Sequence, residues 1–147
     1  MNTRLIIIGG VAGGMSAATR ARRMNEEAPV VVLEKGGFIS YASCGLPYYL
    51  AGRITEEEKL LITNPQKVKE RFGIDARVGH EVRRIDRANK QVEVVERETG
   101  TQYALPYDKL ILATGATPIV PLIEHVRAPN VFLLRTCLLY TSDAADE

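Results

Sequence analysis

LIIIGGVAGGMSAATRARR, residues 5–23, decides the fold of this chain: a short apolar run passes through a glycine-rich turn into a segment with helical spacing. Small residues share one face of that predicted helix: Gly14, Ala17, Ala18 and Ala21. Such a face lets a helix pack closely on a sheet. A second apolar run follows at residues 30–33 and ends at Glu34, and it predicts a second strand. Two strands joined by one helix form a right-handed β-α-β unit almost without exception. The stretch therefore predicts an α/β fold with a parallel sheet.

A second helix is predicted at residues 65–72. Asn64 is a good N-cap residue, Pro65 suits the first helical position, and Gly73 can end the helix. A helix of this length depends on tertiary packing for its stability. We therefore expect one of its faces to lie against the rest of the domain.

The middle of the chain is rich in β-forming residues. Four segments there alternate or favour strands, and together they predict a small antiparallel meander: residues 74–78, 81–86, 91–96 and 101–105. Turn signals at residues 88–90 and 98–100 separate the last three segments. Residues 107–113 are then expected to form a buried strand, which stops at Thr114 and Gly115.

The composition is that of an ordinary soluble globular domain. The 147 residues are 46% hydrophobic and 25% charged, and the net charge of +1 gives no electrostatic reason to expect nucleic acid or an anionic membrane as a partner. No apolar run approaches the roughly 18 residues of a spanning helix. Two cysteines are too few for a disulfide framework, which favours a reducing, cytoplasmic location. His80 and His125 lack Cys or carboxylate neighbours at ligand spacing, so no metal site is predicted.

The glycine-rich turn fits a dinucleotide-binding pattern, G-x-G-x-x-G with an acidic residue about twenty positions later. Gly9 and Gly14 take the first and third glycine positions, and Val11 replaces the middle glycine. Glu34 follows Gly14 by twenty residues and would take ribose hydroxyls, while the helix N-terminus would face a pyrophosphate. These residues leave FAD and NAD equally open. The alternative is that the glycines merely form a turn and Glu34 merely ends a strand at the surface.

Cys44 stands in SYASCGLPYYLAG, residues 40–52, ten residues after Glu34, so its thiol should lie near a bound cofactor. That pairing suggests thiol redox chemistry. A protein with its own dithiol would carry a second cysteine in CxxxxC spacing, but Tyr49 occupies that position, so the partner sulfur must come from elsewhere. The residues that follow could begin a helix, whose N-terminus would favour the thiolate. The alternative for Cys44 is a buried small apolar residue.

Three motifs resemble the pyridine nucleotide-disulfide oxidoreductases with a single active-site cysteine, and among these the coenzyme A (CoA)-disulfide reductases and CoA-dependent persulfide reductases. They are IIIGGVAGG at residues 6–14, SYASCGLPYY at residues 40–49 and LATGATP at residues 112–118. The resemblance covers residues 1–136 and implies the N-terminal part of a Rossmann-like FAD-binding domain that is incomplete at its C-terminus. The family's NAD(P)H-binding and dimerisation domains are not expected within this chain.

The last residues, 137–147, read CLLYTSDAADE and continue none of the patterns before them. They resemble the translation of an adapter used in sequencing libraries. We therefore expect a non-native tail, with a frayed native terminus as the alternative, and we give Cys137 no weight in any redox argument.

The resemblance implies that the cofactor is FAD and that Cys44 is the catalytic residue against the flavin. The family's cofactor contacts map onto one set of positions: Gly9, Gly10, Val11, Ala12, Gly13, Gly14, Glu34, Lys35, Ser43, Val82, Ala113, Thr114 and Gly115. Its CoA contacts map onto a second set: Ser16, Arg20, Arg23, Ser40, Ser43 and Arg71. Tyr41 and Ser43 depart from the Phe and Asn of the family's FANC string, and this serine keeps a hydroxyl but loses the amide.

The resemblance also implies a reaction. Electrons pass from NAD(P)H through FAD to a mixed disulfide between Cys44 and CoA, and the freed Cys44 thiolate attacks the next CoA disulfide or persulfide. One rival is an NADH oxidase or peroxidase in which Cys44 cycles through sulfenic acid. Another is an inactive FAD-binding fragment, and we expect little or no turnover from the 147-residue chain itself. The full-length protein is expected to be a homodimer.

Overall fold

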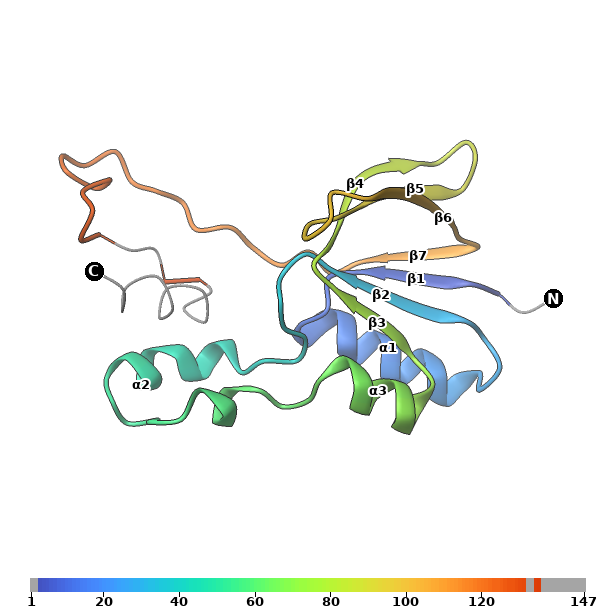
Figure 1. Ribbon diagram of the computed structural model, residues 1–147, viewed down its shortest axis with the longest axis horizontal. Coiled ribbons are helices and arrows are strands. Elements are labelled where there is room, and N and C mark those ends of the chain that lie inside the picture. The colour runs from blue at the N-terminus through green and yellow to red at the C-terminus, as the bar shows by residue number, and fades with distance from the viewer. Residues whose placement is uncertain (1–2, 132–133, 136–147) are drawn as a thin grey trace. The chain divides into compact units, whose positions relative to one another are not determined.

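The computed structural model describes residues 3–131 and 134–135 (Figure 1). The chain forms two compact units. They divide as follows: the residues up to Tyr41 with Leu61–Gly115, and Ala42–Leu60 with the described residues after Gly115.

A parallel sheet of four strands forms the centre of the first unit, in the order β3-β2-β1-β7. The strands are β1 (Leu5–Ile8), β2 (Val30–Glu34), β3 (Asp75–Val78) and β7 (Lys109–Leu112). β1 pairs in parallel with β2 on one side and with β7 on the other. The predicted parallel sheet is therefore confirmed, with the isoleucine-rich run at its centre.

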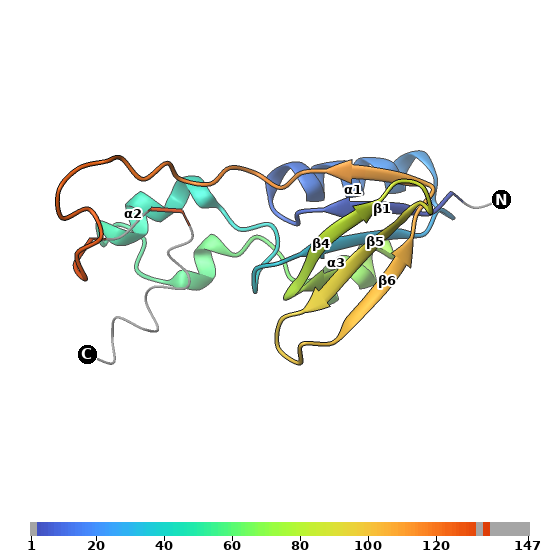
Figure 2. The ribbon, with the colours of Figure 1, turned by 90° about the horizontal axis from the view of Figure 1, so that it is seen from above.

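Two helices, α1 (Ala12–Met24) and α3 (Pro65–Phe72), cover one face of this sheet (Figures 1 and 2). Gly14 and Ala18 are buried in α1, as the pattern of small residues predicts. The core on this side contains residues from both helices and from alternate positions of the strands: Ile7, Met15, Ala18, Val30, Val32, Ile39, Val68, Ile74 and Ala76. Close packing of α1 therefore fixes the glycine turn that precedes it.

α3 begins and ends as its sequence predicts. The Asn64 side-chain oxygen Oδ1 accepts a hydrogen bond from the backbone N–H of Lys67 at 2.9 Å. Gly73 adopts a left-handed conformation with φ of +62°, and its N–H donates to the carbonyl of Lys69. Only glycine reaches this conformation without strain from a Cβ atom. Both ends of α3 are thus set by local chemistry, and Val68 anchors the helix in the core.

An antiparallel sheet covers the other face of the parallel sheet (Figure 1). Its strands are β4 (His80–Asp86), β5 (Gln91–Glu96) and β6 (Gln102–Pro106), in that order. Ile6 and Leu33 from the parallel sheet pack here against Val92 and Val94. Ile6 and Ile7 of β1 therefore pack into the cores on opposite faces of the sheet. Because both faces are buried, the apolar run of β1 is continuous rather than alternating.

The prediction for residues 74–78 is wrong in one respect. These residues were expected in the antiparallel meander, but β3 pairs in parallel with β2, with Val31 opposite Asp75 and Glu34 opposite Val78. A β-rich composition predicts a strand without specifying its partner. The partner is set here by α3, which brings the chain back beside β2 so that Ile74 and Ala76 enter the helix-side core. The meander accordingly has three strands.

The strand expected at residues 107–113 is present as β7, but it is not fully buried. Leu110 and Ile111 are half-buried, and Leu112 is 62% exposed. Among the described residues β7 has a strand partner only on its β1 side, so it is an edge of the parallel sheet. The apolar run within residues 107–113 predicted a buried strand, as expected at the centre of a parallel sheet, where both faces are covered. β7 is instead at the edge of the sheet, and this position explains why its side chains are partly exposed.

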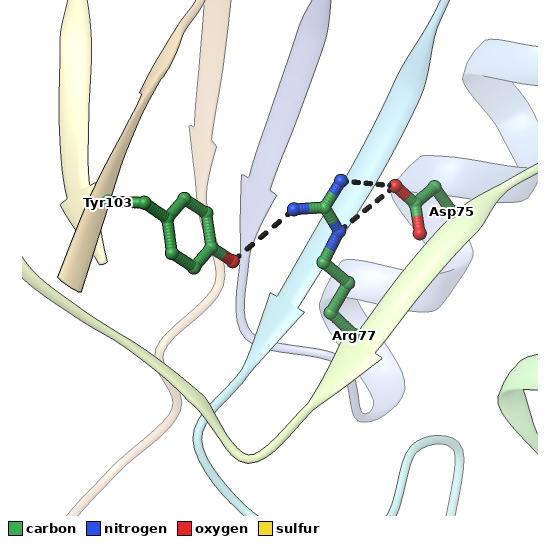
Figure 3. A network of polar contacts seen from close by, with 3 residues as sticks. All are labelled: Asp75, Arg77 and Tyr103. Carbon is green, nitrogen blue, oxygen red and sulfur yellow. Dashed lines mark hydrogen bonds and ion pairs between the residues drawn. The ribbon is translucent and has the colours of Figure 1, made fainter. Parts of the chain in front are cut away.

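A polar network joins the two sheets of the first unit (Figure 3). The Arg77 guanidinium on β3 donates to Oδ2 of Asp75 at 2.7 and 3.0 Å and to the hydroxyl of Tyr103 on β6 at 3.3 Å. The hydrogen bond to Asp75 is the main reason that the pKa of Arg77 is raised above its ordinary value. Arg77 also lies over the Tyr103 ring. The network therefore links the antiparallel sheet to the edge strand β3.

The second unit contains η1 (Ser43–Gly45), α2 (Leu46–Leu50) and η2 (Glu57–Leu60). Gly45 is packed so tightly that an added Cβ would lie 2.6 Å from Leu60. Within the described residues, no helix has the length and apolar character needed to cross a bilayer. The tail predicted at residues 137–147 lies outside the described residues.

Candidate cofactor and substrate site

The turn between β1 and α1 requires glycine at the first and third positions of the predicted pattern. Gly9 has a φ of +102°, and a Cβ added there would lie 2.1 Å from the carbonyl oxygen of Ala113. A Cβ added at Gly14 would lie 1.7 Å from the carbonyl oxygen of Gly9. The N–H of Ala113 also donates to the carbonyl of Ile8 at 2.8 Å. The end of β7 and the glycine turn are therefore held in direct contact.

Gly13 differs from these glycines because the chain leaves space beside it. The nearest atom to an added Cβ would be the Cβ of Ala113, at an ordinary contact distance of 3.7 Å. Gly13 and Ala12 are exposed, no side chain caps α1, and its first turn carries no acidic residue. The first N–H groups of a helix lack intrahelical acceptors and attract anions. This exposed first turn fits a pyrophosphate.

Glu34 is fixed beside the turn by two backbone hydrogen bonds. Its Oε2 accepts from the N–H of Gly10 and its Oε1 accepts from the N–H of Gly36, both at 2.7 Å. A Cβ at Gly10 would lie 2.9 Å from the Cβ of Glu34. Each carboxylate oxygen retains further acceptor capacity, so the group can also accept from hydroxyls such as those of a ribose. The pattern predicted a role for Glu34 but not its bond to Gly10.

Apart from Ser43, which belongs to the second unit, the remaining predicted cofactor positions lie in several places within the first unit. Thr114 and Gly115 are exposed residues that follow β7, and Lys35 is an exposed residue that follows β2. The Lys35 carbonyl accepts a hydrogen bond from Arg97. Val82 is half-buried on β4, next to a shift in the register with β5. Glu34 and the end of β7 therefore both lie in direct contact with the glycine turn. Val82 lies on the antiparallel sheet.

A pocket of about 840 Å³ lies within the first unit between α1, α3 and the segments that flank them. Three of the residues predicted to contact CoA line it: Ser16, Ser40 and Arg71. Arg20 and Arg23 are exposed on α1 and are not among its lining residues. Sequence reasoning missed several polar residues of the lining: Thr19, Tyr41, Thr63, Lys67 and Glu70. The rest of the lining is apolar: Val11, Ala12, Met15, Ile62, Val68 and Phe72.

Ser40 connects this pocket to the glycine turn. Its N–H donates to the carbonyl of Gly10 at 3.0 Å, and its carbonyl accepts from the N–H of Ile62 at 3.2 Å. Its φ of +49° is uncommon for a residue with a side chain. The next residue, Tyr41, forms an isolated antiparallel bridge with Leu61. The segment that leads to Cys44 therefore starts from an anchored position on the turn.

Cys44 lies in η1 of the second unit, immediately before α2. It is an exposed free thiol, and Ser43 beside it is also exposed. Pro47 stands in the first turn of α2, where its missing N–H costs no helical hydrogen bond. This position corrects the alternative of a buried apolar cysteine. The thiol is open to a second molecule.

Arg22, which lies between Arg20 and Arg23 in the sequence, has a structural role. Its guanidinium donates to the carbonyl of Gly73 at 2.9 Å and to the carbonyl of Glu26. It thus joins the end of α1 to the end of α3. Across residues 3–131 and 134–135, no group of His, Cys, Asp and Glu side chains could hold a metal ion.

The parallel sheet, the glycine turn and the carboxylate at the end of β2 define a dinucleotide-binding domain. Residues 3–141 match the family described as pyridine nucleotide-disulphide oxidoreductase, and the chain belongs to this family. FAD is the cofactor typical of the family. The exposed first turn of α1 and the position of Glu34 fit that group.

Three curated proteins illustrate the similarity. The chain is 36% identical to a coenzyme A disulfide reductase from Staphylococcus haemolyticus over 77% of its own length and 26% of the relative. It is 38% identical to an NAD(P)H coenzyme A polysulfide/persulfide reductase from Pyrococcus horikoshii, over 90% of this chain and 28% of the relative. It is 34% identical to an NADH oxidase from Methanocaldococcus jannaschii, over 90% of this chain and 30% of the relative. The chain thus spans between a quarter and a third of these relatives.

A solved structure shows the same arrangement. The reduced Bacillus anthracis CoADR-RHD superposes with a TM-score of 0.83 at 42% identity, over 86% of this chain and 23% of that chain. The predicted fold class and the resemblance stated from the three motifs are both confirmed.

Proposed function

We propose that these residues belong to an FAD-dependent oxidoreductase that uses NAD(P)H to reduce CoA disulfide or a CoA-linked persulfide through Cys44. The single observation that carries the proposal is the position of Ser40. Its N–H is bonded to the carbonyl of Gly10, whose own N–H is bonded to Glu34. One short stretch therefore links the cofactor turn, the pocket and the segment that leads to the exposed thiol.

The cofactor would be held by backbone groups and one carboxylate. The first-turn N–H groups of α1, at Ala12 and Gly13, would bind the pyrophosphate, and Gly13 has the space that this approach needs. Glu34 would accept hydrogen bonds from the ribose hydroxyls of the adenosine. FAD, when bound, would supply two electrons taken from NAD(P)H to the site.

The pocket would hold CoA. The nucleotide end of CoA carries several phosphate charges, and its pantetheine arm carries amides and aliphatic carbons. Hydroxyl groups along the lining suit the amides, and the apolar residues suit the aliphatic part. Arg71 supplies a guanidinium for a phosphate.

Cys44 would carry the covalent chemistry. Its thiolate attacks one sulfur of CoA disulfide, the sulfur–sulfur bond breaks, and one CoA leaves as a thiolate. The other CoA remains joined to Cys44 in a mixed disulfide. Two electrons that originate from NAD(P)H then break this bond, so the second CoA leaves and the Cys44 thiolate is regenerated. With a persulfide substrate, the same attack transfers the outer sulfur, which leaves as hydrosulfide on reduction.

An NADH oxidase or peroxidase is the second candidate function, because Cys44 is exposed and the Methanocaldococcus jannaschii relative is an NADH oxidase. A peroxide would oxidise the thiolate to sulfenic acid, and two electrons from NADH with two protons would return it to the thiol and release water. The same fold and the same cysteine serve both reactions.

The test is an acceptor series on the full-length protein that contains these residues. NADH and NADPH consumption is measured with CoA disulfide, a CoA persulfide, hydrogen peroxide or oxygen. We expect CoA disulfide or the persulfide to give the largest kcat/KM, and Cys44→Ser to lose that activity while retaining the yellow cofactor. A colourless wild-type protein, or a Cys44→Ser variant with unchanged reductase turnover, would contradict the proposal. A preference for peroxide or oxygen would favour the second candidate.

A further inference from the structure

A series of hydrogen bonds connects the Glu34 carboxylate to the antiparallel sheet. Oε1 of Glu34 accepts from the N–H of Gly36, and the carbonyl of Gly36 accepts from the N–H of Gly79 at 2.9 Å. The carbonyl of Gly79 in turn accepts from the N–H of Arg97 at 2.8 Å. The loop that follows β2 is therefore fastened to the residue that follows β5.

The Arg97 side chain joins the same two parts of the unit a second time. Its Nη1 donates to the carbonyl of Lys35 at 3.4 Å, and its Nε lies 4.0 Å from Oε2 of Glu81 on β4. Lys35 follows Glu34, and Glu81 precedes Val82, another predicted cofactor position. Arg97 therefore contacts a neighbour of each of these two cofactor positions.

The stability of the unit does not account for this side chain. The two sheets already share a buried apolar core, and Arg77 joins them through Tyr103. The Arg97 side chain is 58% exposed, and exposed ion pairs contribute little to stability. Its contact with the Lys35 carbonyl acts instead on the loop beside Glu34.

We propose that Arg97 is a positioning residue for the adenosine end of FAD, which holds the loop beside Glu34 in the place that ribose binding requires. This inference rests on the proposed function, in which Glu34 binds the ribose hydroxyls, and it adds the residue that fixes the loop around that carboxylate. Arg97 acts through the backbone of Lys35 and Gly36. Without its side chain the loop is freer, so FAD must order the loop on binding and binds less tightly.

The experiment compares FAD with ADP, which carries the adenosine and two phosphates but no flavin. Flavin-free full-length protein is titrated with FAD and followed by flavin fluorescence, and ADP affinity is measured from its competition with FAD. The variants are Arg97→Ala and Arg97→Lys. Urea unfolding of each flavin-free variant measures its stability, and the absorption spectrum of the FAD-bound form reports the surroundings of the flavin.

Arg83→Ala is the matched control. The Arg83 side chain pairs with the same Glu81 carboxylate at 3.1 Å and is 61% exposed, close to the 58% of Arg97. In the described part of the chain, no hydrogen bond joins Arg83 to Lys35. The two alanine variants therefore differ in the contact with the loop beside Glu34.

We expect Arg97→Ala to weaken FAD and ADP binding alike, by about 5-fold, the size expected for one hydrogen bond. Arg97→Lys should recover part of this affinity, because an ammonium group lacks the fork that reaches two partners at once. Arg83→Ala should match the wild type for both ligands. The spectrum of the bound flavin should be the same in every variant, since the contacts lie at the adenosine end.

Three outcomes would overturn the inference. Arg97→Ala could bind FAD and ADP as tightly as the wild type, with or without a lower urea midpoint, and its role would then be structural at most. Arg83→Ala could weaken both ligands equally, which would assign the effect to Glu81 alone. Arg97→Ala could lose FAD affinity but keep ADP affinity, which would place the effect at the flavin. A folded wild-type protein that binds no FAD would instead remove the proposed function itself.

Discussion

Glu34 and Gly10 are joined by a hydrogen bond of 2.7 Å from the backbone N–H to the carboxylate, across 24 residues of sequence. The same carboxylate accepts from the N–H of Gly36 two residues further on. The group that is expected to bind ribose therefore also fixes the glycine turn against the end of β2. Stability and cofactor affinity should respond together when this carboxylate is changed.

Glu34→Gln tests this double role. A glutamine side chain can accept at only one of its two polar atoms, so one of the two backbone N–H groups loses its acceptor. Loss of such a charge-assisted bond costs about 1–3 kcal/mol. We expect the free energy of unfolding to fall by that amount in urea titrations, and the bound FAD of the purified protein to decrease. Unchanged stability in the apo protein would show that these hydrogen bonds contribute little.

Gly14→Ala and Gly13→Ala form a second, paired prediction. At Gly14 the new Cβ would lie 1.7 Å from a backbone oxygen, so the turn must shift, and we expect a loss of more than about 3 kcal/mol or failure to fold. At Gly13 the added methyl has space, and replacing glycine by alanine in a helix stabilises by roughly 0.5–1 kcal/mol. Gly13→Ala should therefore unfold at higher urea as the apo protein.

The same Gly13→Ala variant separates folding from cofactor binding. If the pyrophosphate occupies the space beside Gly13, the methyl group obstructs it, and FAD binding measured by flavin fluorescence should weaken. A variant that is more stable without FAD and binds FAD less tightly would match this expectation. Equal FAD affinity in Gly13→Ala and wild type would place the pyrophosphate elsewhere.

These contacts also show which features the sequence predicted. The strand, turn and helix of residues 5–23 and the ends of α3 depend on neighbouring residues, and they could be recognised from glycine, proline and capping patterns. The partner of β3 could not, because it is decided by the path of α3. The hydrogen bond between Ser40 and Gly10 could not be predicted either, because it joins backbone groups, which carry no sequence signal, across a loop. The pocket lining on α3 depends on how α3 and β3 pack beside β2, and residues far apart in the sequence decide this packing. For this reason the sequence did not predict that Lys67 lines the pocket.

Asp86 gives a prediction about pH. Its Oδ1 accepts from the backbone N–H of Asn89 and its Oδ2 from the Asn89 amide, and the backbone hydrogen bond is the main cause that lowers the pKa of Asp86 below its ordinary value of 3.8. A carboxyl whose pKa is lower in the folded state stabilises the protein above its unfolded pKa. That contribution is lost as pH falls below 3.8 through the folded value.

Asp86→Asn should therefore unfold at lower urea than the wild type at pH 7, and the difference should shrink as pH falls below about 4. Asn89→Ala should show a smaller change, because it removes the side-chain hydrogen bond and leaves the backbone one. Urea midpoints measured at pH 7 and pH 3 check both expectations. If the difference in urea midpoint between the wild type and Asp86→Asn grows on acidification, a carboxyl other than Asp86 dominates the pH dependence of stability.

The Arg77–Tyr103 contact provides the last prediction, because it joins the two sheets on which Glu34 and Val82 lie (Figure 3). Tyr103→Phe removes the hydroxyl that accepts from Arg77 and keeps the ring below the guanidinium, so we expect a loss of about 1 kcal/mol or less. Tyr103→Ala also removes the half-buried ring and should cost about 2–4 kcal/mol. Urea titration of both variants gives these values, and hydrogen exchange of β6 amides shows where the loosening occurs. If Tyr103→Phe costs as much as Tyr103→Ala, the hydroxyl rather than the ring holds the antiparallel sheet to β3.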